Sequence, residues 1–168
     1  AAHGYAMAQC NLGVMYREGQ GVAQDFTKAR EWWELAAAQG EAAAQFALGI
    51  MYDKGQGVAQ DFTKAREWYE LAAAQGLAGA QYNLGVMYVQ GQGVAQDFTK
   101  AREWFELAAA QGNAEGQYNL GVMYREGQGG AQDLTKARAA REWFELAVAQ
   151  GHAMAQYNLG CIYRKGQG

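Results

Sequence analysis

Apolar residues along this chain recur at the spacing of one helix face, in short blocks that end at glycines. In the block that ends at Gly55, the apolar positions are Ala44, Leu48, Met51 and Tyr52, in an i, i+4, i+7, i+8 order. This spacing predicts an amphipathic α-helix of about three turns, which we call helix A.

A short loop is expected after helix A. The run Gly55-Gln56-Gly57 should end the helix, because glycine readily adopts the left-handed conformation that follows a helix C-cap. Residues 58–60 then form the rest of the loop, and Asp61 occupies the position of an N-cap for a following helix.

The segment after Asp61 has the pattern of a second amphipathic helix, helix B. Its apolar face is formed by Ala65, Trp68, Tyr69, Ala72 and Ala73. Its solvated side carries Lys64, Arg66, Glu67 and Glu70. Gly76 ends it, so the unit consists of helix A, a loop and helix B.

This unit recurs along the chain. The run GQGVAQDFTKAREW occurs unchanged from Gly19, Gly55 and Gly91, and an altered copy starts at Gly127, with a period of 36 residues. A fixed period in this range is typical of a solenoid, in which each unit buries its apolar face against its neighbours. We expect one array over residues 1–168, with repeats at about 5–40, 41–76, 77–112 and 113–151 and a partial repeat at 152–168.

A glycine stands in the middle of every expected A helix, at Gly13, Gly49, Gly85, Gly121 and Gly160. Glycine costs a helix interior about 1 kcal/mol relative to alanine, so its recurrence predicts a close approach by another part of the chain. We expect helices A and B to cross at this glycine. The expected contact is the core tryptophan of helix B, at Trp32, Trp68, Trp104 and Trp143.

The fourth repeat is three residues longer than the others. The central glycines are 36 residues apart three times and then 39 residues apart, and the extra residues lie near 139–141. We predict a longer fourth B helix whose first turn and preceding loop project from the array.

The shared pattern of the copies resembles the Sel1-like repeat, a relative of the tetratricopeptide repeat. In the third copy the matching residues are Leu84-Gly85, Met87-Tyr88, Gly91-x-Gly93-Val94, Asp97, Lys100-Ala101, Trp104, Ala108-Ala109 and Gln111-Gly112. The resemblance covers essentially the whole chain. It implies an all-α fold, a right-handed superhelical α-solenoid of antiparallel helix pairs with about nine helices. Members of the family are often bacterial, and they hold other proteins or peptides.

The resemblance also implies a partner-binding surface, because helix A lines the concave face in the tetratricopeptide arrangement. One position carries tyrosine in three copies, Tyr82, Tyr118 and Tyr157, with Cys10 and Phe46 in the others. The next position carries asparagine in four copies, Asn11, Asn83, Asn119 and Asn158, with Ala47 in the second. Six residues after the asparagine position, three copies carry arginine, Arg17, Arg125 and Arg164, with Asp53 and Val89 in the others.

These residue types suit the recognition of a peptide. An asparagine amide both donates and accepts hydrogen bonds to a peptide backbone, and an arginine receives a carboxylate through two parallel bonds. The alternative is structural: the tyrosines pack between adjacent A helices, and the asparagines bond a neighbouring loop. A second candidate surface is formed by the B-to-A turns, where the copies differ at Tyr5, Glu41, Leu77, Asn113 and His152.

Composition narrows the class of partner. The formal charge is -3 with both signs interspersed, so the chain has no basic stripe for nucleic acid. No apolar run approaches the roughly 20 residues that span a bilayer, so no membrane insertion is expected. Neither end of the array has a polar cap, and we hypothesise end-to-end self-association through the terminal repeats.

The sequence offers little for catalysis or metal binding. The absence of serine excludes a Ser-His-Asp arrangement, and His3 and His152 have no second ligand at zinc spacing. Cys10 and Cys161 have no candidate base at motif spacing. We therefore predict no catalytic residue, metal or cofactor, and interpret the chain as a non-enzymatic scaffold or adaptor for proteins or peptides. The alternative, suggested by relatives, is a receptor for a small molecule or cell-wall fragment in a pocket between helices.

Overall fold

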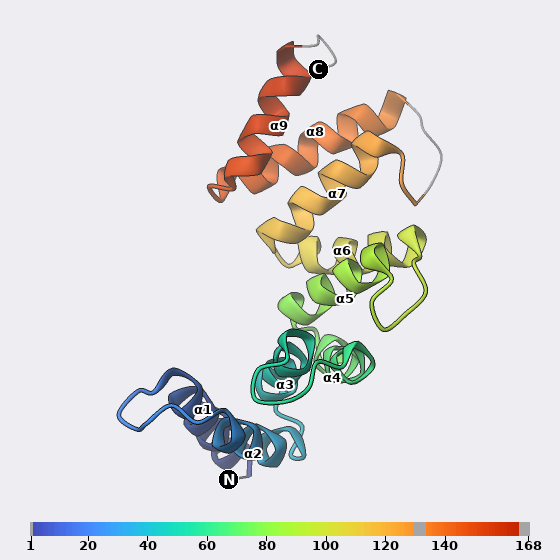
Figure 1. The fold of residues 1–168 in the computed structure, drawn as a ribbon. Helices are drawn as coiled ribbons and strands as arrows, with labels where there is room; N and C mark the ends of the chain where they lie inside the picture. The colour runs from blue at the N-terminus through green and yellow to red at the C-terminus, as the bar shows by residue number, and fades with distance from the viewer. Residues whose placement is uncertain (1, 130–133, 165–168) are drawn as a thin grey trace. The chain divides into compact units, whose positions relative to one another are not determined.

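The computed structural model describes residues 2–129 and 134–164, and within these ranges it contains nine α-helices and no strand (Figure 1). The helices are α1 (Ala2–Glu18), α2 (Phe26–Ala37), α3 (Ala42–Lys54), α4 (Phe62–Ala74), α5 (Ala78–Gln90), α6 (Phe98–Ala110), α7 (Ala114–Glu126), α8 (Leu134–Ala149) and α9 (Ala153–Arg164). Odd-numbered helices are the expected A helices and even-numbered helices are the B helices. The predicted all-α repeat fold is confirmed.

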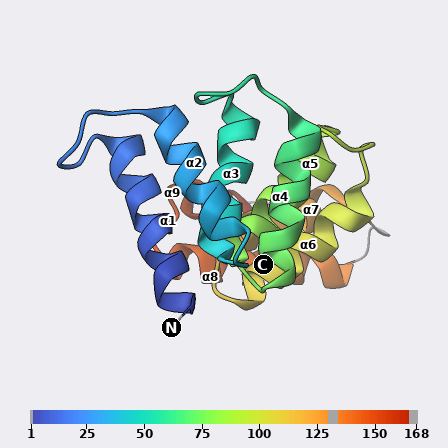
Figure 2. The same ribbon diagram turned by 90° about the horizontal axis from the view of Figure 1, so that it is seen from below.

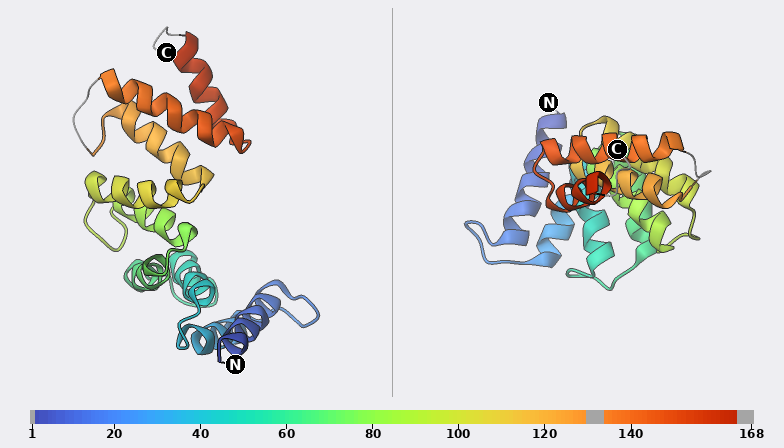
Figure 3. Two further views of the ribbon diagram at one scale, coloured as in Figure 1. Left: turned by 180° about the vertical axis from the view of Figure 1, so that it is seen from behind. Right: turned by 90° about the horizontal axis from the view of Figure 1, so that it is seen from above.

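The chain divides into two compact units. The first contains the residues up to Ala80 together with Gln92–Val94, and the second contains Gln81–Gly91 and the residues from Ala95 onward. In the first unit α1 packs on α2 and α3 packs on α4, and Figure 2 shows these pairs side by side. In the second unit α7 packs on α8 and α8 packs on α9, as Figure 3 shows from two sides. Within each unit, these helices therefore lie against their neighbours in sequence.

The helix ends follow the predicted capping residues. Asp25, Asp61 and Asp97 have extended backbones, and each carboxylate accepts the backbone N–H of the lysine three residues later at 3.0 Å. Such a cap stabilises a helix by about 1 kcal/mol. Gly55 ends α3 in the left-handed conformation, with φ of 65°. The predicted N-caps and glycine C-cap are confirmed.

The crossing of helices A and B lies at the central glycine, as predicted, but the contacting residue is not the tryptophan. A Cβ added to Gly49 would lie 2.5 Å from a ring carbon of Tyr69, and one added to Gly85 would lie 2.5 Å from the ring of Phe105. The residues in this position are almost completely buried, and they are Trp33, Tyr69, Phe105 and Phe144. The prediction that Trp68 and its copies fill this contact is therefore wrong.

The error is one residue of helix register. Ala101, Phe105 and Ala108 lie at i, i+4 and i+7 on the face that meets helix A, and all three are buried. Trp104 lies about 100° further round the helix and is only partly buried. The copy Trp143 of α8 packs against the apolar cluster of α6 and α7, so this tryptophan position joins neighbouring helix pairs.

A second, polar contact ties each helix B to its own helix A. A glutamine at the end of helix B donates its side-chain amide to a buried glutamine near the start of helix A. The donor–acceptor pairs are Gln39–Gln9, Gln75–Gln45, Gln111–Gln81 and Gln150–Gln117. The last three have donor–acceptor distances of 2.8, 2.7 and 2.8 Å. This pairing fixes one end of each helix pair, and its sequence signal is a glutamine at the same two positions of every copy.

The fourth B helix is longer, as predicted: α8 has 16 residues and α6 has 13. Ala140 is buried in the place that Ala101 has in α6, and the i, i+4 pair Arg141–Glu145 matches Arg102–Glu106. The inserted turn therefore precedes Ala140 and leaves the packing of the rest of α8 unchanged. The predicted projection of the loop concerns residues 130–133, which lie outside the described residues.

Candidate functional site

The tyrosines of the A helices do not form a uniformly exposed row. Tyr82 lies against the ring of Phe105 with a centroid distance of 5.8 Å, and Tyr118 lies against Phe144 at 5.9 Å. Both are partly buried, whereas Tyr157 is 66% exposed. Tyr82 and Tyr118 thus support the helix pair to which they belong, and Tyr157 offers most of its ring to solvent.

The four asparagines also differ in their surroundings. Asn11 is exposed, and Asn83 is partly buried. Asn119 is partly buried and donates its amide to the carbonyl of Glu115 at 2.9 Å. Asn158 is 6% exposed, and its side chain bonds to residues of α7. A continuous, solvent-facing asparagine row is therefore absent from the described residues.

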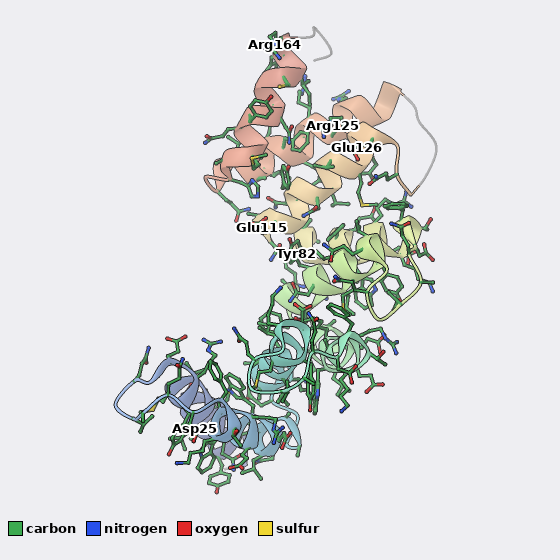
Figure 4. The ribbon with its side chains drawn as sticks, viewed as in Figure 1. Asp25, Tyr82, Glu115, Arg125, Glu126 and Arg164 are labelled. Atoms are coloured by element: carbon green, nitrogen blue, oxygen red, sulfur yellow. The ribbon has the colours of Figure 1, made fainter. Side chains whose placement is uncertain are left out.

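Of the three arginines, Arg125 is held most firmly. Its Nη1 donates to Oδ1 of Asn158 at 2.7 Å, and its Nη2 donates to Glu126 at 3.1 Å. Figure 4 places Arg125 and Glu126 together on α7 and Arg164 at the far end of α9. Arg125 and Arg164 are both exposed, whereas Arg17 is partly buried and pairs with Glu18.

Hydrogen bonds join the tyrosine of one A helix to the asparagine of the next. The Nδ2 of Asn158 donates to the hydroxyl of Tyr118 at 3.4 Å, so Tyr118, Asn158 and Arg125 form one network between α7 and α9. Tyr82 and Asn119 make the corresponding contact between α5 and α7. Burial raises the pKa of Tyr82, the Glu115 carboxylate raises this pKa further, and the bond with Asn119 partly offsets the rise. The structural alternative given above had these tyrosines packing between adjacent A helices, but it paired the asparagines with a neighbouring loop and not with the tyrosines.

The turn before α9 places a histidine beside Tyr118. The imidazole of His152 stacks on Tyr118 with a centroid distance of 4.5 Å and an angle of 18° between the rings. Its Nδ1 accepts the N–H of Ala155 at 3.2 Å, and its Nε2 lies 3.0 Å from a carboxylate oxygen of Glu115. A neutral ring with its proton on Nε2 satisfies both contacts. One of the variable turn positions, His152, therefore meets α7 directly.

Among the described residues no group of His, Cys, Asp and Glu side chains is arranged to hold a metal ion. Cys10 and Cys161 are free thiols, and the pKa of the Cys10 thiol is raised by burial and by the Glu41 carboxylate. None of the helices in the described ranges has the length and apolar character to cross a membrane.

Comparison with known proteins identifies the repeat. The family model of the Sel1 repeat matches residues 6–41, 42–77, 78–113, 114–152 and 153–168. A crystal structure of c5321, a protective antigen of uropathogenic Escherichia coli strains with an SLR fold, has a TM-score of 0.91 and 43% sequence identity. A Sel1 repeat protein from Oxalobacter formigenes has a TM-score of 0.89 and 33% identity.

These matches cover nearly all of this chain but only part of the other proteins. The similarity covers 96% of this chain and 34% of the E. coli antigen, and 97% of this chain and 66% of the Oxalobacter protein. Cysteine rich protein B of Helicobacter pylori, at 23% identity, shares the fold over 67% of this chain and 86% of its own length, with a TM-score of 0.57. No curated protein is similar enough in sequence to be matched.

Proposed function

Because this chain belongs to the Sel1 repeat family, we propose that it is a non-enzymatic scaffold that binds a protein or peptide through its A helices. Sel1 repeats are commonly modules of protein interaction. The surface we assign to the partner lies on α7 and α9 and consists of Tyr118, Arg125, Asn158 and Arg164. We call it the α7/α9 surface.

The observation that carries this proposal is the hydrogen-bonded network of Tyr118, Asn158 and Arg125. It joins two successive A helices and holds the exposed guanidinium of Arg125 between Asn158 and Glu126. A side chain that is already ordered loses less conformational entropy when a partner binds. The network therefore favours binding without adding any catalytic group.

The exposed groups indicate the chemistry of the partner. Arg125 and Arg164 are cationic and solvent-facing, and arginine binds carboxylates through charge-assisted hydrogen bonds. The hydroxyl of Tyr118 accepts from Asn158, so its own proton remains available to an acceptor. We infer a partner segment that presents acidic side chains and backbone carbonyls to the α7/α9 surface.

The test is capture of partners from a bacterial lysate by the whole chain, followed by measurement of Kd with the purified candidate. The double variant Arg125→Ala with Arg164→Ala should lose the partner. The matched control is Lys28→Ala with Arg138→Ala, which removes the same charge from exposed positions of α2 and α8. This control variant should still bind the partner. Circular dichroism verifies that both variants remain folded.

Two results would contradict the proposal. One is equal loss of the partner in both double variants, because that would indicate a general effect of charge. The other is saturable binding of a low-molecular-weight ligand in the absence of any retained protein, because a receptor for a small molecule would then explain the chain better.

A further inference from the structure

The turn between α8 and α9 places an imidazole where a helix cap belongs. His152 directly precedes α9, and its Nδ1 accepts the backbone N–H of Ala155, three residues later, at 3.2 Å. The carbonyl of His152 accepts the N–H of Gln156 at 3.2 Å. The side chain of His152 therefore caps α9 in the way that the side chains of serine, aspartate and asparagine cap other helices.

The preceding A helix has a cap that does not titrate. Asn113 directly precedes α7, and its Oδ1 accepts the N–H of Gly116 at 2.8 Å. Glu41, which directly precedes α3, makes no such bond with its side chain. Of these three positions, 152 is the one whose capping group gains or loses a proton close to neutral pH, since an imidazole protonates at about pH 6.5.

The other side of the same ring contacts a different helix. Nε2 of His152 lies 3.0 Å from Oε2 of Glu115 in α7, and the ring stacks on Tyr118 at a centroid distance of 4.5 Å. The His152 side chain is only 11% exposed. A neutral ring with its proton on Nε2 thus connects α7 to the first turn of α9, and we call this connection the His152 bridge.

The groups around the ring keep their charge near neutral pH. On α7, Glu115 is the anion that contacts Nε2, and Arg125 is a cation held in the network of Tyr118. On α8, the backbone carbonyl of Ala147 accepts the N–H of His152 at 3.1 Å and carries no charge. Carboxylates, phenols and guanidinium groups ordinarily do not change charge between about pH 5 and pH 8. A change of pH in this range therefore acts on the cluster through His152.

We propose that the His152 bridge is a pH-dependent device, closed while the ring is neutral and broken on its α9 side when the ring is protonated. Protonation adds a hydrogen to Nδ1, which can then no longer accept the N–H of Ala155. Nε2–H still donates to Glu115, and the positive charge strengthens that bond. The ring therefore stays on α7 with its Nδ1–H facing the N–H of Ala155, so that one donor opposes another. The positive end of the α9 helix dipole disfavours a cation at the same place.

The bridge has a consequence for the α7/α9 surface. The turn that loses its cap, residues 153–156, lies just before Asn158, whose side chain bonds to Arg125 and Tyr118. Loss of the cap weakens the support of this network, so a partner should bind more weakly at about pH 5 than at about pH 8. This consequence rests on the proposed function, whereas the bridge itself is tested on the chain alone.

The experiment follows the whole chain by NMR at about pH 5 and about pH 8. The nitrogen shifts of the His152 ring should show the Nε2–H form at the higher pH. The exchange rate of the Ala155 amide with water is divided by the rate of an unstructured peptide at the same pH. This ratio should rise about fivefold at the lower pH, the effect of losing one helix cap. The amide of Gly116, which Asn113 caps, should show no such rise.

His152→Asn is the matched variant, because it introduces the residue type that caps α7. An asparagine Oδ1 accepts a hydrogen bond at both pH values, so the exchange ratio of Ala155 should no longer depend on pH. The chain has one other histidine, His3, and His3→Asn should leave the pH dependence of Ala155 in place.

Three results would overturn the proposal. They are a His152 ring that carries its proton on Nδ1 at the higher pH, an Ala155 exchange ratio that does not change with pH, and a change that persists in His152→Asn. Partner binding is a separate measurement. If the bridge opens in acid but a retained partner binds equally at both pH values, only the consequence for the α7/α9 surface is wrong. If no partner is retained at either pH, the proposed function fails and the bridge stands.

Discussion

The ring of Phe105 lies directly against the backbone of Gly85. A Cβ at position 85 would come within 2.5 Å of Cε1 of the ring, a separation that real structures essentially never show. The glycine is therefore required by its neighbour and not by the helix, since α5 would be more stable with alanine at this position. The same relationship recurs between Gly49 and Tyr69.

Gly85→Ala should destabilise the protein. The overpacking cost of about 1–3 kcal/mol exceeds the gain in helix propensity of about 1 kcal/mol. Gly160→Ala is the matched control and should be neutral or stabilising, because its Cβ would have no atom of the described residues within 4 Å. Urea denaturation followed by circular dichroism measures both midpoints. A lower midpoint for Gly160→Ala than for Gly85→Ala would contradict the packing described here.

Phe105→Ala should cost about 3–5 kcal/mol in unfolding free energy, the range for a fully buried aromatic residue. Trp104→Ala should cost clearly less, because Trp104 is only partly buried. The two residues are adjacent in sequence, so the comparison isolates helix register. If Trp104→Ala lowered the thermal midpoint more than Phe105→Ala, the register of α6 would be wrong.

Asn158→Ala should destabilise the protein by about 1–3 kcal/mol, since it removes the partly buried hydrogen bonds that the Asn158 side chain makes with Arg125 and Tyr118. Asn11→Ala replaces an exposed copy of the same repeat position and should change stability by no more than about 0.5 kcal/mol. Thermal unfolding of the two variants provides the measurement. Equal losses would mean that the network between α7 and α9 contributes nothing.

Asn83→Ala combined with Asn119→Ala should leave thermal unfolding nearly unchanged if these residues serve a partner. Asn119 has a structural bond to lose, because its amide bonds to the carbonyl of Glu115 and to Tyr82. Separate single variants resolve the two positions. Destabilisation by Asn119→Ala alone, with partner binding intact, would show that Asn119 has a structural role and does not contact the partner.

Cys10 should react with a thiol reagent more slowly than Cys161 in the folded protein at pH 8. Burial and the Glu41 carboxylate raise the pKa of Cys10, so less of the reactive thiolate is present below that pKa, and the thiol is also shielded. Because the folded pKa is raised, the contribution of Cys10 to stability is complete below the unfolded pKa and is lost as pH rises through the folded pKa.

The measurement compares Cys161→Ser, which retains Cys10, with Cys10→Ala, which retains Cys161. The reaction rates should converge in denaturant, where burial no longer distinguishes the two thiols. Rates that are already equal in the folded protein would show that Cys10 is accessible.

Much of the fold was predictable because its determinants are local. The glycine after α3, the aspartate before α4 and the apolar spacing of the two helices each act within a few residues. The candidate site was less predictable, because its properties depend on contacts between repeats. Asn11 and Asn158 occupy equivalent places in the sequence, but only Asn158 has Arg125 and Tyr118 beside it.

The sequence by itself determined the number and limits of the described helices, the crossing at the central glycine and the family. Only the tertiary structure decided that Phe105, not Trp104, meets Gly85, and that Asn158 is buried while Tyr157 is exposed. Adjacent helical residues differ by about 100° in direction, and both aromatic positions fit an apolar face. Which of them points inward depends on how neighbouring helices pack, and that is a property of contacts far apart in the chain.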